Sequence, residues 1–362
     1  ANEKARPGYY ATRLDRYGVD VELTATKRVG LHKYTFPASQ EAAVVFDLEN
    51  GGCWDKATET AFVSDGLRLS GYRYSTGWAK DQRVYFTAEF SKPVKNISYP
   101  DASETVPEEG DVTVKGRYAR VEFDTTDGEP LYMKVAISPV SIENAKLNMQ
   151  AELPGWDFEA TAAAADKAWN AELQKVRVET SDEAARRIFY TALYHTMIDP
   201  RIYTDADGRY PGADGRIHTT GGRFTKRTIF SGWDVFRSQM PLQTIINPQL
   251  VSDLVNSLVT MADESGRHYF ERWEIVNAYS GCMLGNPALS VLADAYAKGI
   301  RSYDVEKAYR YAVNSSKRFG NDPLGYTPSE LCISHTLEYA YTDWCISRLA
   351  TQLGKREDAA LY

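Results

Sequence analysis

The chain has 362 residues, which is enough for two domains of ordinary size and at least one large hydrophobic core. Hydrophobic residues make up 43% and charged residues 25%, close to the globular average, which argues against intrinsic disorder. The net charge is −7 and the basic residues are scattered, so the composition argues against nucleic acid as a partner. Aromatic residues reach 12%, a weak indication of contacts with sugars.

No apolar run approaches the roughly 18 residues that would span a bilayer, so no membrane span is expected. The first residues do not form a signal peptide and include no initiator Met, which is typical of a mature or trimmed chain. The cysteines have neither CxxC spacing nor the density of a disulfide scaffold, so buried free thiols are expected. They are Cys53, Cys282, Cys332 and Cys345.

The first part of the chain, from about residue 9 to residue 140, consists of short alternating runs separated by Gly, Pro, Asn and Asp. Such runs are typical of strands. They are clearest at residues 44–48, 83–90, 112–123 and 131–138. Repeated short strands with frequent turn signals predict an antiparallel β-sandwich, and residues 1–150 are assigned to it.

The pattern then becomes helical. An Ala-rich stretch predicts one helix over residues 158–173, inside a helical linker expected to run from residue 151 to residue 178. After the linker, Thr180 and Glu183 fit a capping box at the start of the next helix. Residues 179–362 are therefore assigned to a second, α-helical domain.

Three later segments carry clear helix signals. One helix is predicted over residues 249–264, and another has Asn286 as its cap, Pro287 in its first turn and Gly299 as its terminator. The third ends at Gly354 and shows an apolar stripe at helical spacing. The stripe consists of Leu337, Ala340, Tyr341, Trp344 and Cys345. With no fixed repeat of about 20 to 50 residues, these helices favour an irregular α/α barrel.

The densest combination of carboxylate, guanidinium and indole groups lies in residues 230–237. On a helix, Asp234 and Arg237 share a face and can hold neighbouring hydroxyls of one sugar, while Trp233 packs on the C–H face of the ring. This pattern predicts a carbohydrate-binding site. The alternative is an ordinary Asp–Arg ion pair beside a Trp of the core.

Two further clusters allow a functional and a structural interpretation. Glu271 and Glu274 could form a pair of acids for proton transfer, but a solvated helix face explains the same spacing. Trp78 follows a stretch rich in aromatic residues and Gly. It could reach a ligand across the domain interface, or it could close the core of the sandwich or a contact between the domains.

Motifs for metals and nucleotides are absent from the sequence. The five His residues show no HxxxH or HxH spacing, so no zinc site built from His is indicated. Residues 205–208 (DADG) resemble the start of a calcium loop but lack the later Glu, so a polar turn is the simpler interpretation. The sequence also lacks GxSxG, GxxxxGK[ST] and GxGxxG, which argues against serine-hydrolase and nucleotide chemistry.

Ten short segments occur in an order typical of one enzyme family. They are PGYY (7–10), ELTAT (22–26), YTFP (34–37), GYR (71–73), GWA (77–79), YF (85–86), YTALYH (190–195), WDVFR (233–237), ADAYAKG (293–299) and TLEYAY (336–341). Through them the chain resembles, nearly end to end, glycoside hydrolase family 92. The members of that family are calcium-dependent, exo-acting bacterial α-mannosidases that invert the anomeric centre.

The resemblance implies an N-terminal antiparallel β-sandwich followed by part of an (α/α)6 barrel, the same division that the periodicity gives. It also implies a mannose site between the domains, with Trp233 and Asp234 in its sugar-binding shell and Arg237 and Trp78 as further candidates. The implied partners are mannose-containing glycans, and the implied cofactor is calcium. A periplasmic, cell-surface or secreted location is implied as well.

In the family, the general acid Glu, the Asp residues on the base side and most calcium ligands follow the motif that here ends at Trp344. A Phe-Ser-His segment precedes the part that matches this chain. We therefore expect an internal segment of such an enzyme, and no catalytic residue or metal ligand is assigned within it. Gly232, Met240 and Asn286 stand where the family usually has Leu, His and Asp.

The function expected from the resemblance is the hydrolysis of terminal α-mannosides, of α-1,2 or a related linkage, with inversion of configuration. Two alternatives remain open. One is a non-catalytic glycan-binding protein on the same fold, which the length of the natural reading frame would distinguish. The other is an (α/α)6 glycosidase of different sugar specificity, because a fold alone does not determine the substrate.

Overall fold

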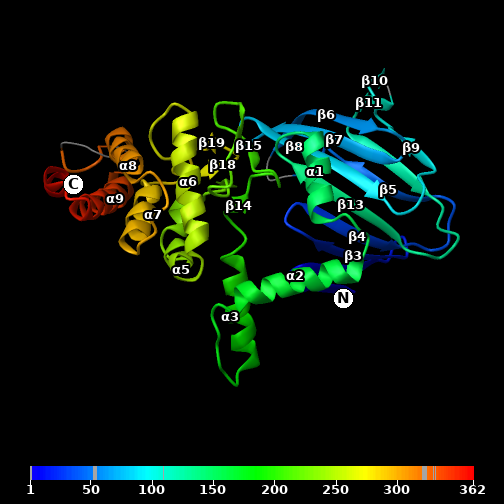
Figure 1. Cartoon of the computed structure of the whole chain (residues 1–362), viewed down its shortest axis with the longest axis horizontal. Helices are drawn as coiled ribbons and strands as arrows, with labels where there is room; N and C mark the ends of the chain where they lie inside the picture. Colours follow the sequence, from blue (N-terminus) through cyan, green and yellow to red (C-terminus); the bar gives the residue numbers. More distant parts are fainter. Residues whose placement is uncertain (1, 52–54, 109, 320–323, 329, 331) are drawn as a thin grey trace. The chain divides into compact units, whose positions relative to one another are not determined.

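The structure is a computed structural model that describes residues 2–51, 55–108, 110–319, 324–328, 330 and 332–362. Its backbone contacts define two compact units (Figure 1). Unit 1 consists of Ala1–Tyr190 and Asp205–Asp207, and unit 2 consists of Thr191–Thr204 and Gly208–Tyr362. Each unit is described by itself below.

The large sheet of unit 1 has ten strands, and every neighbouring pair is antiparallel. The strands lie in the order β1 (Glu3–Arg6), β2 (Tyr9–Leu14), β3 (Val19–Ala25), β4 (Val29–Thr35), β13 (Leu131–Ser138), β8 (Gln82–Phe90), β7 (Arg68–Thr76), β6 (Lys56–Ser64), β11 (Asp111–Lys115) and β10 (Glu104–Glu108). Because β13 inserts between β4 and β8, the last strand in sequence joins two early groups of strands into one sheet.

A second sheet of three strands packs on one face of the large sheet. Its order is β5 (Ala42–Asp47), β12 (Tyr118–Phe123) and β9 (Asn96–Ser98). Phe62, Leu69 and Phe86 of the large sheet are buried against Val121 and Phe123 of β12, so the apolar half of each alternating pattern forms the core between the sheets. The predicted antiparallel sandwich is confirmed. The run 112–123 is divided between β11 and β12, which belong to different sheets.

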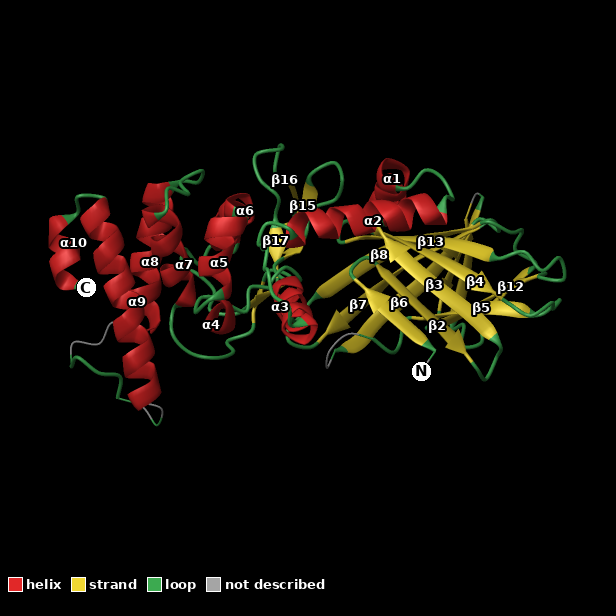
Figure 2. Ribbon diagram, turned by 90° about the horizontal axis from the view of Figure 1, so that it is seen from below, coloured by secondary structure: helices red, strands yellow, loops and turns green. Residues whose placement is uncertain are grey.

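Three helices follow the sandwich: α1 (Ile142–Glu152), α2 (Phe158–Leu173) and α3 (Glu183–His195). On the other face of the large sheet, α1 packs on β13 and β8, and α2 packs on β3 and β4 (Figure 2). Asp157 caps α2 by accepting a hydrogen bond from the amide of Ala160. The helix predicted over 158–173 is confirmed, whereas α1 lies partly within the range that was expected to hold strands.

Unit 2 is mainly helical. Its helices are α4 (Gly232–Val235), α5 (Gln239–Ile246), α6 (Pro248–Glu264), α7 (Pro287–Ala297), α8 (Val305–Phe319), α9 (Cys332–Gln352) and α10 (Arg356–Leu361). Its short strands are β14 (Arg201–Ile202), β15 (Arg209–Pro211), β16 (Ile217–Thr219), β17 (Arg227–Thr228), β18 (Glu274–Ile275) and β19 (Ala278–Tyr279). The core gathers Leu254 and Leu258 of α6, Leu289 and Leu292 of α7, and Ile346 of α9.

The ends of the helices differ in part from the predictions. The side chain of Asp182, not that of Thr180, caps α3 by accepting hydrogen bonds from the amides of Ala184 and Ala185. Asn286 precedes α7 but makes no side-chain capping bond. Gly299 follows the end of α7 and has a φ of 85°, a conformation that favours a residue without Cβ. The predicted terminator of this helix is confirmed.

The apolar stripe predicted for α9 is wrong about which side of the helix is buried. Of the predicted stripe only Cys345 is buried, whereas its other members, among them Leu337 at 67%, are exposed. Ile346 and Leu349, which lie outside the stripe, pack into the core. Of the described cysteines, all are free thiols and only Cys345 is buried. The others are Cys282 and Cys332, and Cys53 lies outside the described residues. No helix within the described residues is both long and apolar enough to cross a membrane.

Candidate functional site

The segment that contains Trp233 is held against a neighbouring loop by its backbone. The amide and carbonyl of Phe230 exchange hydrogen bonds of 3.0 Å with the carbonyl and amide of Glu274. A Cβ atom on Gly232 would lie 2.4 Å from the carbonyl oxygen of Arg272, so this close approach needs a glycine. The single turn α4 starts directly after this contact and directs the side chains that follow.

Trp233 and Arg237 meet on one carboxylate from a distant part of the chain. The indole Nε1 of Trp233 donates to Oε1 of Glu338 at 3.0 Å, and Nη2 of Arg237 donates to the same oxygen at 2.8 Å. The guanidinium carbon of Arg237 lies 4.6 Å from the centre of the Trp233 ring. The side chain of Glu338 is 18% exposed, so these charge-assisted bonds fix the three groups with respect to one another.

Sequence reasoning missed Glu338 as a member of the site. It contacts Trp233 across 105 residues of chain, a distance over which periodicity carries no information. The one available signal was its position in the TLEYAY segment, which contributed to the family resemblance.

Asp234 does not form the ion pair considered as the structural alternative. Within the described part of the chain, the carboxylate that pairs with Arg237 is that of Glu338, at 2.8 Å. Asp234 is exposed and accepts a hydrogen bond from the hydroxyl of Ser231. The site therefore offers one carboxylate held by two donors and a second carboxylate accessible to solvent.

The interpretation of Glu271 and Glu274 as a solvated face is wrong, because each residue is only 2% exposed. Oε1 of Glu274 accepts hydrogen bonds from Thr228 Oγ1 at 2.8 Å and from the amide of Asn277 at 2.7 Å, which is a structural role. Glu271 pairs with Arg267. Burial raises the pKa of Glu271 to about 7, and the charge of Arg267 opposes this shift.

The loop from Glu271 to Asn286 contains several buried polar atoms without a hydrogen-bond partner in the described structure. They are Oε2 of Glu271, Nε of Arg272 and Nδ2 of Asn286. Buried polar groups are nearly always satisfied by protein, water or ligand. Because the Arg272 carbonyl contacts Gly232, these atoms belong to the surroundings of Trp233.

Strained backbone is concentrated in the same region. All non-glycine residues with a positive φ in the described chain lie in or beside the two loops that bring Phe230 and Glu274 together. They are Ile229, His268, Val276, Asn277 and Met283. Such conformations cluster at binding sites, where the surrounding structure over-determines them. They support the assignment of this part of unit 2 as the candidate site.

Trp78 belongs to unit 1, in the loop between β7 and β8, whereas the other three predicted site residues belong to unit 2. It is 39% exposed, so it does not close the core of the sandwich. Its role in binding a sugar stays a prediction.

The DADG segment is a polar turn attached to unit 1. Asp205 is buried and accepts hydrogen bonds from Ser138 Oγ at 2.6 Å and Asn148 Nδ2 at 2.7 Å, while Asn144 donates to Asp207. Burial raises the pKa of Asp205, and the hydrogen bond from Ser138 opposes this shift. No group of three or more His, Cys, Asp or Glu side chains among the described residues could hold a metal ion, so these residues do not fit a calcium site.

Comparison with known proteins identifies relatives over the whole chain. Residues 1–138 match the glycosyl hydrolase family 92 N-terminal domain, and residues 144–362 match the glycosyl hydrolase family 92 catalytic domain. A secreted glycosidase of the fungus Arthroderma benhamiae, described as uncharacterized, is 23% identical over 412 residues, covering 98% of this chain and 47% of its own.

Solved structures agree with this match. A family GH92 α-mannosidase from Bacteroides thetaiotaomicron has a TM-score of 0.90 at 33% identity, with 99% of this chain and 50% of that chain covered. A family GH92 inverting mannosidase of the same organism has a TM-score of 0.87 at 29% identity, with 100% of this chain and 50% of that chain covered.

The chain thus spans about half the length of the relatives it matches. The expected fold class, a β-sandwich followed by part of an (α/α)6 barrel, is confirmed by these structures. The chain belongs to glycosyl hydrolase family 92.

Proposed function

We propose that the protein carrying this chain is an exo-acting α-mannosidase that releases terminal mannose from glycans with inversion of configuration. Family membership supports a glycosidase, and two similar structures are described as α-mannosidase and inverting mannosidase. Another structure of a family GH92 α-mannosidase is described as a complex with mannoimidazole. The name of this ligand indicates a molecule related to mannose. The linkage that we propose is α-1,2 or a related one.

The observation that carries the proposal is the single Glu338 oxygen shared by Trp233 and Arg237. This carboxylate holds the indole ring and the guanidinium in fixed orientations before any sugar arrives, which reduces the entropy lost on binding. The ring can then pack on the C–H face of a terminal mannose. The exposed Asp234 can accept hydrogen bonds from hydroxyls of the same sugar.

The chemical step of an inverting glycosidase needs one carboxylic acid to protonate the leaving oxygen and one carboxylate to activate water across the ring. We assign neither role to the described residues, whose task in this proposal is to bind and orient the sugar. Calcium, when bound, would supply positive charge to the sugar hydroxyls. We propose that the activity requires calcium, and we assign no ligand for it, because no group of described residues could hold a metal ion.

We also propose that the protein acts in the periplasm, at the cell surface or after secretion. The support is the description of the Arthroderma relative as a secreted glycosidase.

The test is hydrolysis of α-1,2-mannobiose by the natural full-length protein, with the anomeric configuration of the released mannose followed by NMR. A panel of aryl glycosides of different sugars is run in parallel. Release of β-mannose, lost in the presence of a calcium chelator, is expected. Initial release of α-mannose would contradict inversion, and cleavage of glucosides in preference to mannosides would contradict the substrate. Hydrolysis that survives chelation would contradict the calcium requirement.

The residue assignment is tested by Asp234→Ala in the same protein. Loss of hydrogen bonds to the bound sugar should lower kcat/KM for an aryl α-mannoside by at least about 100-fold, since charged hydrogen bonds contribute about 1.5–3 kcal/mol each. Asp304→Ala, which removes an aspartate at the start of α8, serves as the control. Near-normal kinetics for Asp234→Ala would contradict the assignment.

A further inference from the structure

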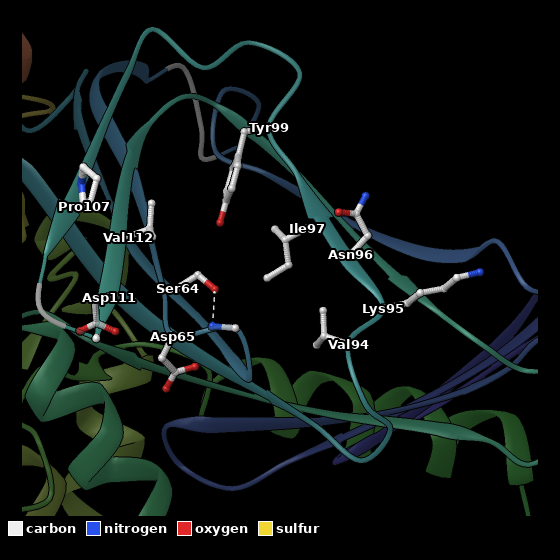
Figure 3. A pocket seen from close by; sticks show the side chains of 12 residues that line it. Ser64, Asp65, Val94, Lys95, Asn96, Ile97, Tyr99, Pro107, Asp111 and Val112 are labelled. Atoms are coloured by element: carbon white, nitrogen blue, oxygen red, sulfur yellow. Dashed lines mark hydrogen bonds between the residues drawn. The ribbon is translucent and has the colours of Figure 1, made fainter.

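The sandwich contains a groove that the candidate site does not use. The ten-stranded sheet is wider than the three-stranded sheet, so part of its inner face is uncovered. A cavity of about 590 Å³ lies there, between the end of β6, the segment around β9 and the β10–β11 hairpin (Figure 3). This volume falls in the range of sites for small ligands.

The interior of the groove combines hydroxyl groups with apolar surface. The hydroxyls of Ser64 and Tyr99 point into the cavity beside the side chain of Ile97 (Figure 3). Ser64 is buried and accepts a hydrogen bond from the amide of Gly66 at 3.1 Å. The ring of Tyr99 packs against Phe62 at 5.7 Å between centres, which fixes the direction of its hydroxyl.

The charged groups at the rim of the groove disfavour an anionic ligand. Asp65 and Asp111 lie on the same side of the mouth (Figure 3). Lys95 is directed away from the cavity, and its Nζ donates to the carbonyl of Gln40 at 2.9 Å. Among the described residues that line the groove, the carboxylates are thus not balanced by an ammonium group, and a phosphate or carboxylate ligand would be repelled.

Two other ligand classes fit poorly. A metal ion is disfavoured because the described residues contain no group of three acidic, His or Cys side chains with suitable geometry. Oδ1 of Asp65 also accepts hydrogen bonds from the amides of Leu67 and Arg68. An extended peptide that adds to the edge of β9 is disfavoured because this strand has three residues and Pro107 lines the opposite wall.

We propose that this groove binds an uncharged saccharide, as an accessory site in unit 1 that is built from other residues than the Trp233–Glu338 site. Sugar hydroxyls would bond to Ser64, Tyr99 and the rim carboxylates, while the apolar wall contacts the C–H groups of the ring. The inference does not depend on the hydrolytic activity, since a glycan can bind here whatever bond the protein cleaves.

The test uses the natural full-length protein with Val112→Trp, which fills the groove from an exposed position on β11. Val45→Trp is the matched control, because Val45 is an exposed residue of β5, the edge strand of the small sheet that lies away from β9. Native gels containing soluble α-mannan, galactomannan or, as a cationic comparison, chitosan measure binding as retardation. The parent and Val45→Trp should be retarded, and Val112→Trp should bind at least tenfold more weakly.

Hydrolysis of a small aryl α-mannoside should be equal in the two variants, which separates this inference from the proposed function. If Val112→Trp lowers the unfolding temperature, Asp111→Ala replaces it with the same expectation. Equal retardation of variant and control would overturn the proposal, because all binding would then occur elsewhere. Absence of retardation by the neutral polysaccharides, or retardation only by the amine-bearing polymer chitosan, would overturn it as well.

Discussion

Glu338 is the residue on which the candidate site depends, since it accepts hydrogen bonds from both Trp233 and Arg237. It acts as a positioning residue in the proposed function. Glu338→Ala should lower kcat/KM for an aryl α-mannoside by about 10- to 100-fold, because two charge-assisted bonds that orient the site are lost. Glu338→Gln keeps an oxygen acceptor and should recover part of the activity.

The control for this prediction is Glu306→Ala, which removes a helix glutamate that pairs with Lys355. Equal activity of Glu338→Ala and Glu306→Ala would show that Glu338 does not orient the sugar-binding groups. A failure of Glu338→Gln to exceed Glu338→Ala would indicate that charge, and not the acceptor, is what matters.

Glu271 makes the stability of unit 2 depend on pH. Burial raises its pKa to about 7 in the folded chain, above the value of about 4.3 in an unfolded one. The folded state therefore holds a proton that the unfolded state releases, so stability is fully present below about pH 4.3 and falls as the pH rises to about 7. The total change from this group is about 4 kcal/mol.

Glu271→Gln removes this titration, and its free energy of unfolding should decrease less than that of the parent between pH 4.5 and 7.5. Denaturant unfolding at several pH values measures the difference, with Glu306→Gln as the control for loss of one charge. If parent and Glu271→Gln show the same pH dependence, the carboxyl of Glu271 is not held neutral in the folded chain.

At the scale of elements, α9 carries apolar residues on its exposed face as well as on its buried face. Leu349 is 2% exposed and lies in the core of unit 2, whereas Leu337 is exposed. In this chain, Leu349→Ala should decrease the free energy of unfolding by about 2–5 kcal/mol and Leu337→Ala by less than about 0.5 kcal/mol. Similar losses for both variants would mean that Leu337 is buried in solution.

Much of the element pattern was predictable from local sequence. Alternation identified 131–138 as a strand, and the Ala-rich stretch identified the helix Phe158–Leu173 with both of its ends. Hydrophobic spacing can establish that α9 exists, but several apolar residues on different faces fit a helix equally well. Only its packing against α7, α8 and α10 decides which face is buried.

At the scale of the whole molecule, each unit has a hydrophobic core of its own. Phe62 is fully buried between the sheets of unit 1, and Leu254 is buried among the helices of unit 2. Calorimetry of the chain should therefore show two transitions, because separate cores allow separate cooperative unfolding. Phe62→Ala should lower the temperature of one transition and Leu254→Ala that of the other, and a single transition shifted by both variants would contradict this.

The sequence alone determined the two-part organisation, the sandwich, most helices and the Trp233-Asp234-Arg237 segment as a sugar-binding candidate. These features are local, since alternation and helical spacing are read within a few residues. Only the tertiary structure decided that Glu338 joins the site across 105 residues and that Arg237 pairs with it. It also decided the burial of Glu271, because burial depends on which segments pack together, and packing between distant segments leaves no periodic trace in the sequence.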